Sequence, residues 1–303
     1  MSHRIPVFYV PEMVGKPTLT PSPSAEKPAK VVADWLAHPD IAERIEVVEF
    51  DSISRDVIAQ AHDPKYVADV LARRADNGFG ERSKSVADSL PFTSGSMLAA
   101  CLHVLGDPDK WGSRSRIACS PSSGFHHAHY DNAYGFCTFN GLMVSAVELK
   151  RRKLIDRVLI LDCDQHYGDG TQDIIDKLGL DWVTHVTHRG SAFGSYRNKA
   201  QMMEFISEWL PQFPGPRTLT IFQAGADCHL NDPLGGFLTT KDMQERDALV
   251  FELAHRHRVP LVWNLAGGYQ REPNGSIPKV LELHRNTMKA CIAAAWQVAG
   301  ANQ

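Results

Sequence analysis

The sequence predicts an α/β fold with a mostly parallel central sheet. Short runs rich in Val, Ile and Leu recur along the chain and are apolar on both faces, as strands buried on both sides of a parallel sheet are. Segments with helical character separate these runs, and such alternation is typical of parallel α/β folds. With 303 residues, of which 43% are hydrophobic, the chain is long enough to bury a large core.

The predicted elements follow one another from the N-terminus. A short strand at 5–10 precedes a loop at 15–28 that is rich in Pro, Ser and Thr, and a helix follows at 29–37. Further strands are expected at 116–120, 157–162, 182–187, 218–224 and 260–266, with helices at 141–152, 200–210, 241–257 and 276–299. Because the early loop lies between predicted elements and no linker or internal repeat follows, we treat residues 1–303 as one domain.

Charge and composition argue against several kinds of partner. The formal net charge is −3, so no overall basic field favours nucleic acid or a membrane surface. The basic cluster at 150–153 is best explained as a solvated helix end. No apolar run approaches the roughly 18 residues of a membrane span. Six cysteines without a C-x-x-C pair, and an N-terminus without a signal-peptide pattern, predict reduced thiols and a cytoplasmic location.

Four of the predicted strands end in segments that carry His, Asp or Tyr together with Gly. These segments read "PSSGFHHAHYD", "DCDQHYGDG", "AGADCHLNDPLGG" and "AGGYQRE". In open parallel sheets, ligands bind in the loops beyond the carboxyl ends of the strands. One edge of the sheet is therefore predicted to hold a chemically active site.

Two of these segments predict a metal site. Asp164 and His166 are two residues apart, so in an extended segment their side chains point the same way and can bind one ion. Asp227, after a separate strand, completes an Asp–His–Asp set. Three protein ligands with one open position are typical of catalytic zinc. The alternative is that Asp162 caps a turn, Asp169 faces solvent and His166 only packs against its neighbours, but a second acidic segment from another strand favours the metal.

Further polar residues predict acid–base chemistry beside that metal. His126 and His127 lie in one irregular loop, and Asp162 and Asp169 are available to orient them. A carboxylate that accepts from one ring nitrogen makes the other nitrogen more basic, so two such pairs supply a general base and a general acid. The hydroxyl of Tyr269 is expected to stabilise an oxyanion across from the metal.

Two other classes of site fit these segments poorly. The serines in "PSSG" lack the G-x-S-x-G turn of a nucleophilic serine. The stretch "HYGDGTQD" has no P-loop lysine, and the anionic Asp169 would repel phosphate.

Together the four segments resemble the zinc-dependent histone deacetylase family, which includes the acetylpolyamine amidohydrolases. The resemblance rests on 124–140, 161–171, 224–236 and 265–269, in the family's order, with weaker support at 91–100. It covers the chain from about residue 90 to residue 290, and the first ninety residues match only loosely. It implies the arginase–deacetylase fold, a three-layer α/β sandwich, with 1–303 as a single deacetylase-like catalytic domain.

The resemblance assigns roles to the catalytic residues. It implies that Asp164, His166 and Asp227 bind zinc, with iron(II) as an alternative. His127, paired with Asp169, is implied as the principal general base and acid, and His126, paired with Asp162, as the electrostatic partner of His127. Tyr269 is implied to bind the acyl carbonyl oxygen.

The resemblance also assigns residues to the substrate and to a second ion. Phe136 and Phe193 are expected to line the tunnel for the acyl-lysine stem, with Gly135 and Gly268 beside them. A K⁺ or Na⁺ ion is expected near the main-chain carbonyls of Asp162, Asp164 and His166 and near Thr187 and His188.

The function expected from the sequence is a metal-dependent amidohydrolase that removes acyl groups, above all acetyl, from lysine in proteins or peptides. The alternatives are deacylation of small N-acyl amines such as acetylpolyamines, and a catalytically silent metal-binding relative. A binuclear manganese hydrolase of the arginase type would need more metal ligands than these segments provide. The oligomeric state is left open.

Overall fold

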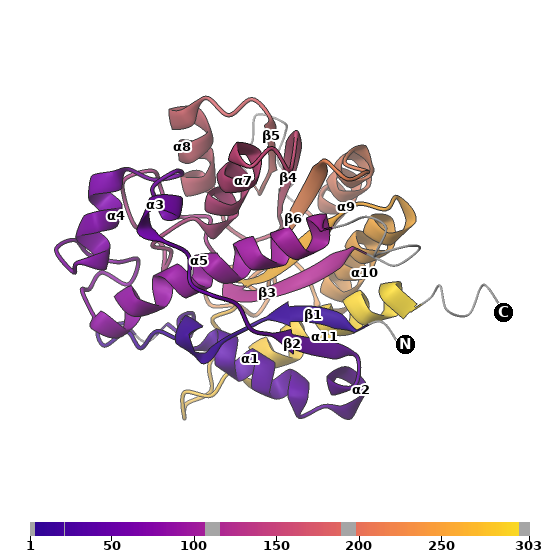
Figure 1. Cartoon of the computed structure of the whole chain (residues 1–303). Helices are drawn as coiled ribbons and strands as arrows, with labels where there is room; N and C mark the ends of the chain where they lie inside the picture. Colours follow the sequence, from indigo (N-terminus) through magenta and orange to yellow (C-terminus); the bar gives the residue numbers. More distant parts are fainter. Residues whose placement is uncertain (1–3, 21, 107–115, 189–197, 297–303) are drawn as a thin grey trace.

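A seven-stranded parallel sheet forms the centre of the protein (Figure 1). The computed structural model describes residues 4–20, 22–106, 116–188 and 198–296. The strands lie in the order β2-β1-β3-β7-β6-β4-β5, and each neighbouring pair is parallel. They are β1 (Ile5–Phe8), β2 (Ile45–Val48), β3 (Ile117–Ser123), β4 (Arg157–Asp162), β5 (Val183–Val186), β6 (Thr218–Gly225) and β7 (Leu261–Ala266).

Helices cover both faces of the sheet (Figure 1). They are α1 (Lys27–Leu36), α2 (Pro39–Ala42), α3 (Arg55–Ile58), α4 (Pro64–Leu71), α5 (Lys84–Leu105), α7 (Gly141–Arg151), α8 (Asp169–Leu178), α9 (Lys199–Trp209), α10 (Thr240–Arg256) and α11 (Pro278–Trp296), with short 3₁₀ turns at Pro11–Met13 and Leu210–Gln212. The predicted three-layer α/β architecture is therefore confirmed.

Two apolar cores fill the spaces between the sheet and its helices. Along β4, Leu159 and Leu161 join the core beneath α1, α9, α10 and α11, whereas Val158 and Ile160 join the core beneath α4, α5, α7 and α8. Successive side chains of a strand point to opposite faces, so a strand buried on both faces must be apolar throughout. The apolar runs of the sequence have this origin.

The strand prediction holds within a few residues, but the strand β2 and the helices α2, α3, α4, α5 and α8 were not predicted. The edge strand β2 is short and half exposed, so it lacks the continuous apolar run of the central strands. Helix α5 contains Pro91 and a buried run of small residues at 94–96, which conceals its helical periodicity. Helix α8 begins within the Asp-Gly-Thr of 169–171, which has the composition of a loop.

The topology brings the four chemically active segments together. They follow β3, β7, β6 and β4, which are four consecutive neighbours in the sheet. Since all the strands are parallel, their carboxyl ends share one edge. The sheet order, which the sequence does not reveal, therefore explains how residues more than one hundred positions apart form one site.

Two further properties concern membrane-spanning helices and the cysteine thiols. Within the described ranges, no helix combines the length and the apolar character that spanning a bilayer requires. All six cysteines are buried as free thiols.

Candidate active site

Asp164, His166 and Asp227 converge at the carboxyl ends of β4 and β6. The Nδ1 atom of His166 lies 3.1 Å from Oδ1 of Asp164 and 3.1 Å from Oδ2 of Asp227. One ligand atom from each residue lies within 4.8 Å of the others. Tetrahedral ligands about 2.1 Å from a zinc ion lie roughly 3.4 Å from each other, so this spacing fits three ligands of one ion.

The electrostatics of these three residues favour a cation. Both carboxylates are buried, and burial, reinforced by the charge of Asp164, raises the pKa of Asp227 to about 7. The hydrogen bonds of His166 to Asp164 and Asp227 raise its pKa to about 11. Two buried carboxylates side by side repel each other unless a positive charge lies between them. The donor set and the potential therefore fit a divalent metal.

Each of the two adjacent histidines has its own carboxylate partner. The Nδ1 atom of His126 lies 2.7 Å from Asp162, and the Nδ1 atom of His127 lies 2.6 Å from Asp169. The two imidazole rings are neighbours, with centroids 4.1 Å apart. In both pairs the carboxylate holds Nδ1, which leaves Nε2 to exchange protons elsewhere.

The two histidines differ in environment. Burial lowers the pKa of His126, but Asp162 and Asp164 outweigh burial and raise it to about 9. For His127, burial and the neighbouring His126 outweigh Asp169, so its pKa falls below the usual value. Opposite shifts in adjacent groups are typical of sites that divide acid and base roles. A cation held by Asp164 would oppose the upward shift of His126.

Gln223, which was not predicted, supports the His126 pair. On β6, its amide nitrogen donates to Asp162 at 2.8 Å, and its amide oxygen accepts from the main-chain N–H of Phe125 at 3.2 Å. One buried side chain thus contacts both the carboxylate of the pair and the residue before His126. The only sequence signal is a polar residue inside an apolar strand, which is costly unless hydrogen-bonded.

A tight turn places Phe136 in the site. Tyr134 and Cys137 exchange main-chain hydrogen bonds, while Gly135 and Phe136 have φ angles of 53° and 64°. A left-handed conformation is unusual for a bulky residue and is typically held by its surroundings at functional sites. The ring of Phe136 lies 5.6 Å from that of Tyr269 and 5.8 Å from that of Phe79. These rings form an aromatic wall beside the predicted metal.

We expect Gly135→Ala to reduce turnover by about 100-fold, because a displacement of about 1 Å at a catalytic group has effects of that size. A Cβ at this position would lie 2.5 Å from Cδ2 of His127 and would push that ring away. The matched control is Gly179→Ala, which has a similar φ of 64° but no atom near the added Cβ. Equal turnover in steady-state assays of the two folded variants would contradict the prediction.

Tyr269 lies at the exit of β7. Its main-chain N–H donates to Asp232 at 2.8 Å. Burial, followed by the charges of Asp227 and Asp164, raises the pKa of its hydroxyl well above the usual value. Gly268 precedes it with a φ of 87°, and a Cβ there would lie 2.9 Å from Val280. The tyrosine is therefore held within the electrostatic field of the predicted metal ligands.

Lys27, also not predicted, is fully buried at the start of α1 and reaches this turn. Its Nζ atom donates to the carbonyl of Gly267 and lies 5.6 Å from the centre of the Tyr269 ring. Burial lowers its pKa to about 8, against the opposing effect of Asp227 and Asp164. A lysine in the polar early loop has no local pattern that separates it from a surface lysine.

Thr187 and His188, which are predicted to lie near a second ion, pack against the segment 162–168. Thr187 accepts from the N–H of Gly168 at 3.1 Å and donates to Asp162 at 3.4 Å. The Nδ1 atom of His188 lies 2.6 Å from the carbonyl of Gln165. Both therefore contact the 162–168 segment. Phe193, predicted as the second tunnel aromatic, lies outside the described residues.

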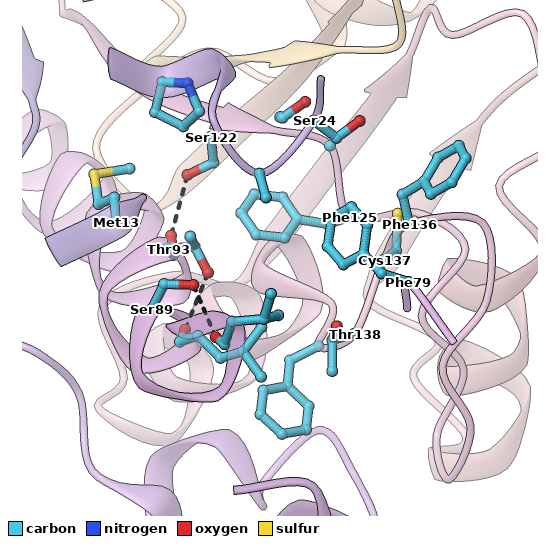
Figure 2. A pocket seen from close by; sticks show the side chains of 17 residues that line it. Met13, Ser24, Phe79, Ser89, Thr93, Ser122, Phe125, Phe136, Cys137 and Thr138 are labelled. Atoms are coloured by element: carbon cyan, nitrogen blue, oxygen red, sulfur yellow. Dashed lines mark hydrogen bonds between the residues drawn. The ribbon is translucent and has the colours of Figure 1, made fainter. Parts of the chain in front are cut away.

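A cavity adjoins the segment that carries His126 and His127, and Figure 2 shows its lining. Phe125, Phe136 and Cys137 form one side of it, close to His126 and His127 in the sequence or within the turn at 134–137. Ser122 and Thr93 contribute polar groups on the other, where the hydroxyl of Ser122 donates to the carbonyl of Thr93. The cavity is thus mixed in character and lies next to the predicted reaction site.

The chain matches known proteins in sequence. The model of the histone deacetylase domain matches residues 22–193, which is more than half of the chain and includes two of the four motifs. An uncharacterized protein of Picosynechococcus sp. is 26% identical over 185 residues, which cover 56% of this chain and 61% of that protein. Histone deacetylase 8 of Xenopus laevis is 45% identical over 60 residues, 20% of this chain and 18% of that protein. The chain thus spans less than two-thirds of either relative.

The fold also matches a solved structure. The structure of an acetylpolyamine aminohydrolase from Burkholderia pseudomallei aligns with a TM-score of 0.71 over 96% of this chain and 99% of that one. The sequence identity is 20%, so this likeness concerns the fold alone.

Proposed function

Because this chain belongs to the histone deacetylase family, we propose that it is a metal-dependent amidohydrolase that removes acyl groups from acylated lysine in proteins or peptides. The observation that carries the proposal is the placement of one three-residue metal cluster and two His–Asp pairs at one sheet edge. Amide hydrolysis needs an electrophilic activator, a base for the attacking water and an acid for the leaving amine. These groups can supply all three.

Asp164, His166 and Asp227 would hold the metal, which we propose is zinc, with iron(II) as the alternative. When bound, such an ion supplies Lewis-acid chemistry, polarising the scissile carbonyl and making water more acidic. His166 is the most exposed of the three, so it lies toward the side from which substrate enters.

His127 is proposed as the proton-transfer group. Asp169 fixes its Nδ1, so Nε2 can take a proton from the attacking water. The same nitrogen then gives a proton to the amine nitrogen as the carbon–nitrogen bond breaks, which leaves a carboxylic acid and a free amine. His126, deeper in the protein and bonded to Asp162, would stabilise charge during this transfer.

Tyr269 and Phe136 are proposed to receive the substrate. The tyrosine hydroxyl would donate to the carbonyl oxygen as negative charge develops there. The lysine stem is a short apolar chain, which suits the aromatic wall of Phe136, Phe79 and Tyr269. Gly135 and Gly268 would allow these rings to approach the substrate, and Phe193 remains a prediction as a further wall residue. We also retain the K⁺ or Na⁺ site at 162–166 with Thr187 and His188, and a cytoplasmic location, as predictions.

A panel of substrates tests the proposal. We expect zinc-loaded protein to hydrolyse acetyl-lysine peptides, and chelation to abolish turnover until zinc is restored. Peptides with longer acyl chains would show whether the cavity beside Phe125 accepts more than acetyl. Hydrolysis of acetylpolyamines but not of peptides would support the small-amine alternative. Metal binding without turnover of any substrate would support a catalytically silent relative, and full activity of metal-free protein would refute the mechanism.

A further inference from the structure

Arg246 lies fully buried on α10, behind the strand ends that carry the proposed metal ligands. Its Nη1 atom donates to two main-chain carbonyls, that of Cys163 at 3.2 Å and that of Gly225 at 2.8 Å. Cys163 directly precedes Asp164, and Gly225 ends β6 two residues before Asp227. A single guanidinium nitrogen thus connects the two backbone segments from which the ligands project.

The surroundings of Arg246 hold it in that position. Its Nε atom donates to Asp247 at 2.8 Å, and the hydroxyl of Thr287 on α11 donates to the same carboxylate at 2.6 Å. The guanidinium also lies 5.8 Å from the centre of the Phe222 ring. Helix α10 is therefore linked to α11 on one side and to the ends of β4 and β6 on the other.

Stability alone is a poor explanation for this arginine. A buried ion pair is often no more stabilising than apolar residues of the same volume. Moreover, the Nη2 atom of Arg246 is buried without a hydrogen-bond partner among the residues described, and such a group is costly. The feature that an apolar residue could not reproduce is the pair of bonds to the two strand ends.

We propose that Arg246 is a positioning residue that sets the separation of the two ligand-bearing segments, and through it the affinity and geometry of the metal site. Arg246 itself touches carbonyl oxygens rather than the ligand carboxylates, so it acts through the backbone. The inference rests on the proposed function for the identity of the ligands. Residues behind a metal site typically change metal affinity by about 10–100-fold when replaced.

The test compares Arg246→Met and Arg246→Lys with Arg285→Met. Arg285 on α11 forms a partly buried bidentate ion pair with Asp34 and does not contact the site, so its loss is a matched control. Co²⁺ is the probe, with affinity measured by chelator competition and geometry by visible absorption. We expect Arg246→Met to weaken Co²⁺ binding by about 10–100-fold with a changed spectrum. Arg246→Lys should recover part of the affinity, because an ammonium group also donates to carbonyls, and Arg285→Met should bind as the wild type does.

Wild-type affinity and spectrum in folded Arg246→Met would overturn the inference, and so would an equal loss in Arg285→Met, which would indicate a general effect of destabilisation. If Arg246→Met does not fold, Arg246→Lys decides the question, since wild-type Co²⁺ binding in that variant would equally overturn the inference. Because binding is measured without substrate, a protein that turns over nothing in the substrate panel but shows the expected affinities would refute the proposed function and leave the role of Arg246 intact.

Discussion

Tyr269→Phe is expected to lower turnover of an acetyl-lysine peptide by about 10²–10³-fold, the usual effect of losing one donor to a developing oxyanion. The variant removes one hydroxyl and keeps the ring. The ring contacts with Phe136 and Lys27 and the main-chain bond to Asp232 therefore remain. Because the hydroxyl acts on the transition state rather than on the metal, metal affinity and KM should change little.

The matched control for this prediction is Tyr134→Phe. Tyr134 also lies at the site, with its ring 5.5 Å from that of His127, but its side chain is largely exposed. Loss of its hydroxyl should leave kcat within about twofold of the wild-type value, because an exposed hydroxyl bonds mainly to water and its removal leaves no buried group unpaired. If both variants lose the same activity, or if Tyr269→Phe loses metal, the proposed role of Tyr269 is wrong.

The sequence predicts the parts of the site that depend on local geometry. Asp164 and His166 are recognisable because alternate residues of an extended segment share a direction. The convergence of Asp227 with them follows from one further rule, that the ends of parallel strands share an edge. In the structure all three lie at that edge. Their order within the sheet was not predictable, because pairing between strands is decided by packing over the whole domain.

The supporting residues escape prediction because their partners are distant in sequence. Lys27 donates a hydrogen bond to Gly267, 240 positions away in the sequence. Arg246 donates one to Cys163, which is 83 positions away. Nothing in the local sequence distinguishes these cations from surface ones. The positive φ of Phe136 is similarly hidden, since it depends on surrounding contacts that include the bond from its N–H to the carbonyl of Gly78.

Asp227→Ala is expected to weaken metal binding by more than about 100-fold and to abolish hydrolysis. Replacement of residues behind a metal site already lowers metal affinity by about 10–100-fold, and removal of a direct ligand lowers it further. The fold should survive in the metal-free protein, because the substitution also removes a buried carboxylate that repels Asp164. Added zinc should raise the melting temperature of the wild type, since a ligand that binds only the folded state stabilises it. The same zinc concentration should leave the melting temperature of Asp227→Ala almost unchanged.

Asp169→Asn is the informative contrast for Asp227→Ala, because it alters a carboxylate that holds His127 rather than the metal. Its side chain stays similar in size, so the zinc-induced rise in melting temperature should persist. Turnover should still fall strongly, because an amide no longer fixes the histidine in the required tautomer. The two variants thus separate metal binding, to which Asp227 is proposed to contribute, from proton transfer, for which Asp169 is proposed to orient His127. Loss of the zinc-induced shift in Asp169→Asn, or its retention in Asp227→Ala, would show that this division of roles between the carboxylates is wrong.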